Sequence, residues 1–297
     1  MQTQRQSLAV EIAAEYPEKL TSAQKERRRA LVVPREHGAW GMLLVPLVTG
    51  AVIGLEENGS VTSVLLLTTA VLALFWLRTP AESWLGTGTV QAQTPHERRH
   101  AAKFIALSAS IAALSLIALL WQGRNRQLFL LGGVAAVAFT GQFYLKKLGR
   151  STRMISEFVG AAVLTVTAPA AYCAATGRLD SQAWFLWVLN WMFAANQVHF
   201  VWLTIRGARA SGWSEKFRVG WRFLVGQFVL AGVLIVTSHY RWLPALVLAA
   251  FLPALFRGCA WFAKPPQPIV LRRLGWTEMA HAIAFGTLLI TAYSVRM

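Results

Sequence analysis

The sequence predicts an all-α membrane protein, a polytopic bundle of about nine transmembrane helices. Of its 297 residues, 55% are hydrophobic and only 14% are charged, well below the roughly 25% charged that is usual in soluble domains. Nine apolar windows recur along the chain, each near the length that spans about 30 Å of hydrocarbon. The 13 Trp and 16 Phe residues suit the aromatic belts at the two membrane boundaries.

The strongly basic net charge of +16 raises nucleic acid as a partner. We nevertheless expect no nucleic-acid binding, because the Lys and Arg residues fall between the apolar windows rather than along one soluble face. The two cysteines, Cys173 and Cys259, lie in apolar segments far apart in the sequence, which favours small buried thiols. The partner that the composition predicts is the lipid bilayer.

The chain divides into two parts at the level of the sequence. The first thirty residues are polar and basic, and their longest apolar run, Leu8–Val10, is far short of a signal peptide. We therefore predict a cytoplasmic basic tail at residues 1–30 and a transmembrane helical domain at residues 31–297.

The nine windows follow the tail in order. They lie at Gly38–Leu55, Val61–Leu77, Phe104–Trp121, Leu128–Leu145, Phe158–Ala175, Trp184–Ile205, Phe223–Ser238, Trp242–Phe256 and Trp276–Val295. The seventh and eighth are short and have Arg222 and Arg257 at their ends, so the helix count near residues 217–262 stays open. No pair of half-helices broken by Gly or Pro stands out.

The distribution of Lys and Arg predicts the orientation. With the amino terminus inside, only 5 of the 29 Lys and Arg residues fall on the outer side, which is a strong positive-inside bias. The carboxyl terminus is then expected outside. The longest cytoplasmic loop is expected between Arg78 and Lys103, a length at which loops are often functional or flexible.

The stretch between the tail and the first window is unusual, because Arg35, Glu36 and His37 stand together where the chain enters the bilayer. Gly38 and Gly41 follow and leave a bare strip that another helix can approach. The run Pro-Arg-Glu-His-Gly-Ala-Trp-Gly-Met-Leu, residues 34–43, resembles the opening signature of the YwiC-like family of bacterial integral membrane proteins. The resemblance extends over roughly residues 30–297. It implies a multi-pass protein of the bacterial inner membrane and assigns no biochemical activity or cofactor.

Ionisable and strongly polar residues recur near the expected cytoplasmic ends of the windows. Because such groups are costly in a membrane and usually face an interior, they predict one polar cavity open to the cytoplasmic leaflet. The candidate residues are Arg35, Glu36, His37, Arg78, Glu82, Glu157, Asn196, His199, Glu278 and His281. The alternative is a set of separate hydrogen bonds between helices.

Two of the candidate pairs, Asn196 with His199 and Glu278 with His281, have i,i+3 spacing and so share a helix face. At 1.5 Å per residue, both histidines are expected roughly 10 Å into the inner leaflet. The cavity hypothesis pairs Glu36, Glu157 and Glu278 with Arg35, Arg78 and the imidazoles. It expects at least three residues of one set to line a single pocket: His37, Arg78, Glu157, His199 and His281.

Three chemistries are open to such a cavity. The architecture resembles the UbiA-type intramembrane prenyltransferases, in which aspartate-rich segments hold a Mg²⁺–diphosphate with hard oxygen ligands. The matching segments here read Arg78-Thr-Pro-Ala-Glu82 and residues 196–206, and the single aspartate, Asp180, falls on the outer side. A transferase would therefore have lost its metal motifs, and we predict no metal site from them.

The second chemistry is a metal or haem site, since Glu278 and His281 have the spacing used in di-metal bundles and His199 could face His281. The third is transport or binding of a small anionic or amphipathic, lipid-like ligand, for which buried Glu and His are typical. Whether the chain is an enzyme, a transporter or a binding protein stays open, as does any cofactor. We therefore interpret the chain as a YwiC-like membrane protein with a polar cavity that opens to the cytoplasmic leaflet.

Overall fold

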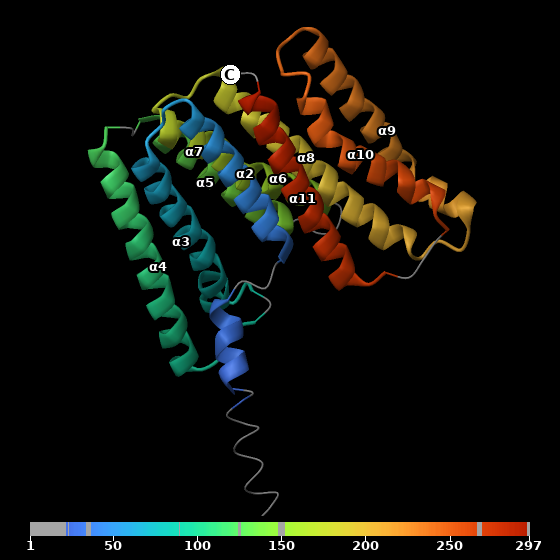
Figure 1. The fold of residues 1–297 in the computed structure, drawn as a ribbon. Coiled ribbons are helices and arrows are strands. Elements are labelled where there is room, and N and C mark those ends of the chain that lie inside the picture. The colour runs from blue at the N-terminus through green and yellow to red at the C-terminus, as the bar shows by residue number, and fades with distance from the viewer. Residues whose placement is uncertain are drawn as a thin grey trace, which may run out of the picture. The chain divides into compact units, whose positions relative to one another are not determined.

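The computed structural model describes residues 22, 24–33, 37–88, 90–123, 126–147, 152–265 and 269–295. Every regular element in these ranges is an α-helix (Figure 1), so the all-α prediction is confirmed. The labelled helices are α2 His37–Glu56, α3 Val61–Leu85, α4 Pro95–Trp121, α5 Arg126–Lys147, α6 Arg153–Thr165, α7 Thr167–Thr176, α8 Ser181–Gly207, α9 Trp213–His239, α10 Val247–Ala263 and α11 Leu271–Ser294. Most of the predicted basic tail lies outside the described residues.

Several of these helices have the length and composition of membrane spans. Five described segments meet both criteria: Gly38–Glu56, Val61–Leu85, Pro95–Trp121, Met154–Thr176 and Trp213–His239. Large apolar side chains are exposed on several helices, including Val137, Phe228 and Phe256, which are 70–77% exposed. Soluble proteins rarely expose contiguous apolar patches. The chain is thus a membrane-type helical protein with several candidate spans, while the count of nine and the orientation stay predictions.

The fifth window was predicted as one helix, and the structure contains a break in it. It is built from α6 and α7, which meet at Val166, whose N–H bonds to the carbonyl of Val163 at 3.3 Å. The carbonyl of Ala162 accepts a hydrogen bond from Trp187 Nε1 at 3.1 Å instead. A neighbouring helix thereby satisfies a backbone group that the break sets free, as an apolar environment requires.

The eighth window was placed wrongly. Residues 242–246 precede the helix, and α10 runs from Val247 to Ala263, straight through Arg257. The arginine does not end the helix because a carboxylate neutralises it there, as described below. Cys259 on the same helix is exposed, which corrects the expectation of a buried thiol, whereas Cys173 is buried as predicted.

The described chain forms two compact units. The first contains residues 24–33 and 69–117, where the Leu31 carbonyl accepts from Ser83 Oγ at 3.2 Å and Arg27 pairs with Glu97 at 2.6 Å. These bonds attach the start of the chain to the connection between α3 and α4. Only residues 86–94 connect those helices, so most of the predicted long loop is helical.

The second unit contains residues 36–68 and 118–297, and its closest helix contact joins α2 to α7. A Cβ atom on Gly50 would lie 2.0 Å from the carbonyl oxygen of Ala168, and one on Gly54 would lie 2.7 Å from the Ala175 Cβ. Thr167 Oγ1 donates to the Leu43 carbonyl at 3.2 Å. Only glycine allows the two backbones to approach this closely.

Helix α11 lies beside α2 and runs in the same direction (Figure 1). Gly41, near the start of α2, faces Met279, and Glu56 at its end accepts a hydrogen bond from Ser294 at 2.7 Å. Between α8, α10 and α11 the core contains stacked aromatic rings, with the centroids of Phe193 and Phe285 4.0 Å apart. This packing sets the mutual positions of α8 and α11 from which the candidate site is built.

Candidate functional site

A buried ion pair joins α10 to α11. Arg257 Nη1 donates to Glu278 Oε1, and each side chain is only 11% exposed. The guanidinium carbon lies 4.0 Å from the centroid of the Phe200 ring on α8, a cation–π arrangement. A buried charge is strongly destabilising without a partner, so the two residues hold each other in place.

Helices α8 and α9 add amide side chains to this ion pair. Gln197 Nε2 donates to the Glu278 carbonyl at 2.8 Å, and Gln227 Nε2 donates to Asn196 Oδ1 at 2.7 Å. Gly258, next to Arg257, leaves room for the Gln227 amide, which would lie 3.3 Å from a Cβ atom there. We call five residues the Arg257 cluster: Asn196, Gln197, Gln227, Arg257 and Glu278.

The Arg257 cluster has unused hydrogen-bonding groups. Among the described residues, five of its buried atoms have no partner: Asn196 Nδ2, Gln227 Oε1, Arg257 Nε, Arg257 Nη2 and Glu278 Oε2. Such a group costs about 1–3 kcal/mol when it is buried and unsatisfied, and the large majority of buried polar atoms do have partners. The cluster therefore has the capacity to bind a polar ligand or water.

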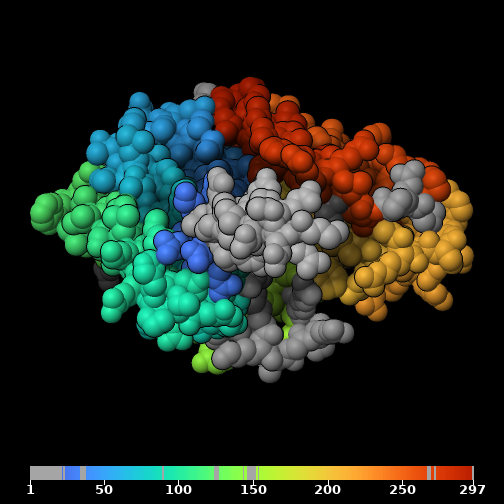
Figure 2. All heavy atoms as spheres, turned by 90° about the horizontal axis from the view of Figure 1, so that it is seen from below, coloured from blue at the N-terminus to red at the C-terminus, as the bar shows by residue number. Residues whose placement is uncertain are grey.

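A hollow of about 390 Å³ lies beside the cluster, between α8, α9, α10 and α11. Its cationic lining residues are Lys216, Arg257, Lys264 and Arg273, and His281 also lines it. No acidic residue is among the described residues that line it, and its remaining walls include the apolar residues Phe200, Trp261, Ile269, Val270 and Leu274. Figure 2 shows the molecule from the end at which α11 begins, with α9 in gold to orange and α11 in red. A cleft lined by one sign of charge concentrates ions of the opposite sign.

Lys216 holds one edge of this larger hollow. Its side chain is buried, 2% exposed, and its Nζ donates to the carbonyl of Trp261 at 2.5 Å and to that of Lys264. The ammonium also lies 4.2 Å from the centroid of the Trp261 ring. These carbonyls belong to the end of α10, where a cation is favourable. Lys216 thus fixes the end of α10 against α9.

A second, smaller hollow has a volume of about 210 Å³. Glu278 lines the smaller hollow, Arg257 lines the larger one, and Leu274 lines both. The first turns of α2 contribute Gly38, which has open space beside it, and Gly41, where a Cβ would lie 3.3 Å from Met279 Sδ. The close approach of a helix to the predicted glycine strip is therefore confirmed at Gly41.

The structure brings three of the predicted site residues together. Asn196 and Glu278 belong to the Arg257 cluster, and His281 lines the larger hollow, with its Nδ1 2.7 Å from the Thr277 carbonyl oxygen. Arg35 and Glu36 lie outside the described residues. His37 begins α2, but its side chain lies outside them too.

The remaining predicted residues line neither hollow. Arg78 and Glu82 pair with each other in the first unit, at 2.9 Å. Glu157 on α6 accepts a hydrogen bond from Trp202 Nε1. The ring of His199 lies against Phe158 and Phe223, with centroid distances of 6.4 and 5.1 Å.

The expected partners of the carboxylates need correction. Glu278 pairs with Arg257, because α10 continues past the arginine and brings it opposite α11, whereas Arg78 pairs with Glu82. The sequence did carry a signal that the helix continues past Arg257. Apolar residues continue on both sides of Arg257, from Val247 to Ala263, so the arginine stands inside an apolar run rather than at its boundary.

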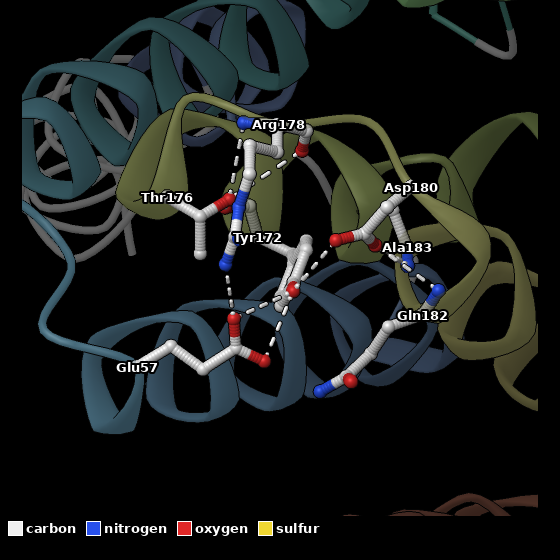
Figure 3. Close-up of polar contacts among 7 residues, drawn as sticks. All are labelled: Glu57, Tyr172, Thr176, Arg178, Asp180, Gln182 and Ala183. Atoms are coloured by element: carbon white, nitrogen blue, oxygen red, sulfur yellow. Dashed lines mark hydrogen bonds and ion pairs between the residues drawn. The ribbon is translucent and has the colours of Figure 1, made fainter.

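A second polar cluster lies just beyond the other end of α2 (Figure 3). The Tyr172 hydroxyl lies 2.9 and 3.0 Å from the two carboxylate oxygens of Glu57 and 3.2 Å from Asp180 Oδ2. Arg178 Nη2 donates to Glu57 at 2.7 Å, and Asp180 caps α8 by accepting from two backbone N–H groups. We call Glu57, Tyr172, Arg178 and Asp180 the Tyr172 cluster. Across the described residues, no group of three or more His, Cys, Asp or Glu is placed to hold a metal ion.

Comparison with known protein families gives a match over part of the chain. Residues 33–172 match the family described as YwiC-like protein. A search of curated proteins finds no match. The matched segment begins immediately before the signature at residues 34–43 and ends in α7, so the predicted resemblance is confirmed over these residues. It includes the α2 wall of the smaller hollow, whereas every residue of the Arg257 cluster lies beyond it.

Proposed function

We propose that this chain, a YwiC-like protein over residues 33–172, binds a small anionic or amphipathic ligand at the membrane. The ligand occupies the larger hollow. One observation carries the proposal: four cationic side chains line this hollow, and no acidic residue is among its described lining residues. Fixed charges of one sign attract the opposite charge into such a cleft.

The walls of the larger hollow favour an amphipathic ligand. Phe200, Trp261 and Leu274 offer apolar surface beside the charged groups. The volume of about 390 Å³ falls within the range of about 300–1,000 Å³ that is typical of small-molecule sites. A ligand with a compact anionic head and a short apolar chain satisfies both kinds of wall.

The exposed basic residues of the larger hollow indicate the side of the membrane from which the ligand binds. Lys264 and Arg273 line the hollow with exposed side chains, and the positive-inside rule puts such residues on the cytoplasmic face. The ligand then comes from the cytoplasm or from the inner leaflet of the bacterial inner membrane. Group transfer is not part of the proposal, because the segments at residues 78–82 and 196–206 contain no aspartate.

Equilibrium binding to the protein in phosphatidylcholine nanodiscs tests the proposal. The probes are radiolabelled decanesulfonate, decanol as the neutral counterpart and methanesulfonate as the head alone, with empty nanodiscs as the blank. We expect decanesulfonate to bind. The double change Lys264→Gln/Arg273→Gln removes two exposed lining charges and should weaken this binding about tenfold.

The matched control is Arg209→Gln/Arg272→Gln, which removes two exposed basic side chains that do not line the hollow. This variant should bind decanesulfonate as the parent does. Equal binding of decanol and decanesulfonate, or equal losses in the two double variants, would contradict an anion site in the larger hollow. Binding of methanesulfonate with the affinity of decanesulfonate would identify a small anion as the ligand instead of an amphiphile.

A further inference from the structure

The two partners of the Arg257–Glu278 ion pair line different hollows. We infer that an anion in the larger hollow takes over the pairing of Arg257, and that the released Glu278 binds a proton. Uptake of one anion is thereby coupled to uptake of one proton. This inference rests on the proposed function, since it requires an anion in the larger hollow.

The hydrogen bonds of Arg257 indicate how the exchange occurs. Its Nη1 is used for Glu278, while Nε and Nη2 have no partner among the described residues. Those two nitrogens form one edge of the planar guanidinium, and such an edge matches two oxygens of a carboxylate, phosphate or sulfonate. The side chain already lines the larger hollow, so a turn of the guanidinium presents the edge to an anion there.

The loss of its partner makes Glu278 bind a proton. Within the Arg257 cluster the charges of Arg257 and Glu278 cancel, and the other members are neutral amides. When the guanidinium turns to the anion, the Glu278 carboxylate stays buried without its cation, which is strongly unfavourable. The other cations, Lys216, Lys264 and Arg273, line the hollow that holds the anion and not the one that Glu278 lines. A buried carboxylate without a partner becomes neutral by binding a proton, so an O–H bond forms on Glu278 as one breaks in a hydronium ion of the surrounding solution.

The ionisable groups around Glu278 determine which other residue could accept the proton. Helix α10 contributes Arg257, and α8 contributes the neutral amide of Gln197. On α11 itself, His281 lies one turn further on. The described side chains of α2 that line the smaller hollow with Glu278 are not ionisable, and the side chain of His37 lies outside the described residues. His281 is therefore the residue to exclude by experiment.

The test measures anion binding and proton uptake together, in phosphatidylcholine nanodiscs. Decanesulfonate is the probe, because its head remains ionised at every pH at which the protein is folded. If binding takes up a proton, affinity falls as pH rises, by about tenfold per pH unit where Glu278 changes its protonation. A pH-indicator dye in weakly buffered solution should report about one proton bound per anion.

Two variants assign the proton acceptor. Because both residues line a hollow, the quantity compared is the number of protons taken up per anion bound, whatever the affinity. Glu278→Gln should take up no proton per anion bound, whereas His281→Gln should still take up about one. Loss of proton uptake in His281→Gln alone would overturn the assignment to Glu278. The dye measurement on the unmodified protein needs no variant, so it stands even if Glu278→Gln does not fold. Binding without proton uptake overturns this inference and leaves the proposed function intact, whereas absence of binding overturns the proposed function.

Discussion

The two polar clusters lie near opposite ends of α2 and differ in how far their hydrogen bonds are completed. In the Tyr172 cluster, Glu57 contacts both Tyr172 and Arg178, and Asp180 caps α8. None of the buried unpartnered side-chain atoms found in the described ranges belongs to it. The Arg257 cluster holds all but one of those atoms and lies between two hollows.

This difference distinguishes a structural network from a binding site. Buried polar groups that complete one another's hydrogen bonds make a structure rigid, whereas a partly satisfied network is costly. The Tyr172 cluster joins the end of α2 to α7 and to the start of α8, next to the close contact at Gly54. In the Arg257 cluster, the unpartnered groups of Arg257 and Glu278 belong to side chains that line a hollow, where a ligand can satisfy them.

The largest effect on stability is expected from breaking the buried ion pair on one side. Arg257→Met leaves the Glu278 carboxylate buried and unpaired, which should lower the free energy of unfolding by about 3–5 kcal/mol. The double variant Arg257→Met/Glu278→Met should recover most of that loss. Unfolding in detergent, followed by circular dichroism, measures both. A single variant as stable as the parent would show that the pair is not buried in the membrane-embedded protein.

The next largest effect is expected at the contact between α2 and α7. Gly50→Ala places a Cβ atom 2.0 Å from the carbonyl oxygen of Ala168, so the two helices must separate, at a cost of about 1–3 kcal/mol. Gly38→Ala on the same helix is the control, because no atom lies within 4 Å of the added Cβ. The two variants should differ clearly in their thermal unfolding midpoints. Equal midpoints would mean that α2 and α7 are not so closely packed.

A smaller effect is expected from removing the hydroxyl at the centre of the Tyr172 cluster. Tyr172→Phe should lower the free energy of unfolding by about 1–2 kcal/mol, since the hydroxyl bonds to charged groups. Decanesulfonate binding should not change. A loss of binding in a variant that remains folded would show that the Tyr172 cluster belongs to the ligand site after all.

The smallest effect is expected at the exposed ion pair of the Tyr172 cluster. The Arg178 side chain is 63% exposed where it pairs with Glu57, and exposed pairs contribute at most about 1 kcal/mol. Arg178→Gln should therefore stay within about 1 kcal/mol of the parent in unfolding free energy, with the difference shrinking at high salt. If Arg178→Gln lowered the free energy of unfolding as much as Arg257→Met does, the exposed and the buried ion pair would not differ as the comparison requires.

The sequence was sufficient for most of the helices and insufficient for their pairing. Apolar windows predicted α2 to α5, the segment that contains α6 and α7, and α8, α9 and α11, because hydrophobic length sets where a membrane helix lies. The eighth window failed at Arg257, since the charge was interpreted as a membrane boundary when only a tertiary partner, Glu278, allows it inside the helix. The i,i+3 spacing of Glu278 and His281 correctly placed both near one site, but the two line different hollows.

The break between α6 and α7 was missed for a similar reason. The local signal is Pro169, three residues after Val166, because its nitrogen cannot donate to the Thr165 carbonyl and proline is favoured in the first turn of a helix. The compensating donor, Trp187, comes from a helix later in the chain. The positive-inside count treats Lys216 like every other basic residue on the cytoplasmic side, whereas it is buried against the end of α10. In each case the deciding contact joins residues distant in sequence, which periodicity and charge counts do not show.

The most direct test of the account is an experimental structure of the protein in nanodiscs with a brominated decanesulfonate. The account predicts the sulfonate density in the larger hollow, within hydrogen-bonding distance of Arg257, and the bromine along the wall that contains Trp261 and Leu274. It also predicts that the carboxylate of Glu278 has separated from the guanidinium. Sulfonate density at Arg178, or an empty larger hollow at saturating probe, would contradict the claim that the unpartnered groups of the Arg257 cluster mark an anion site.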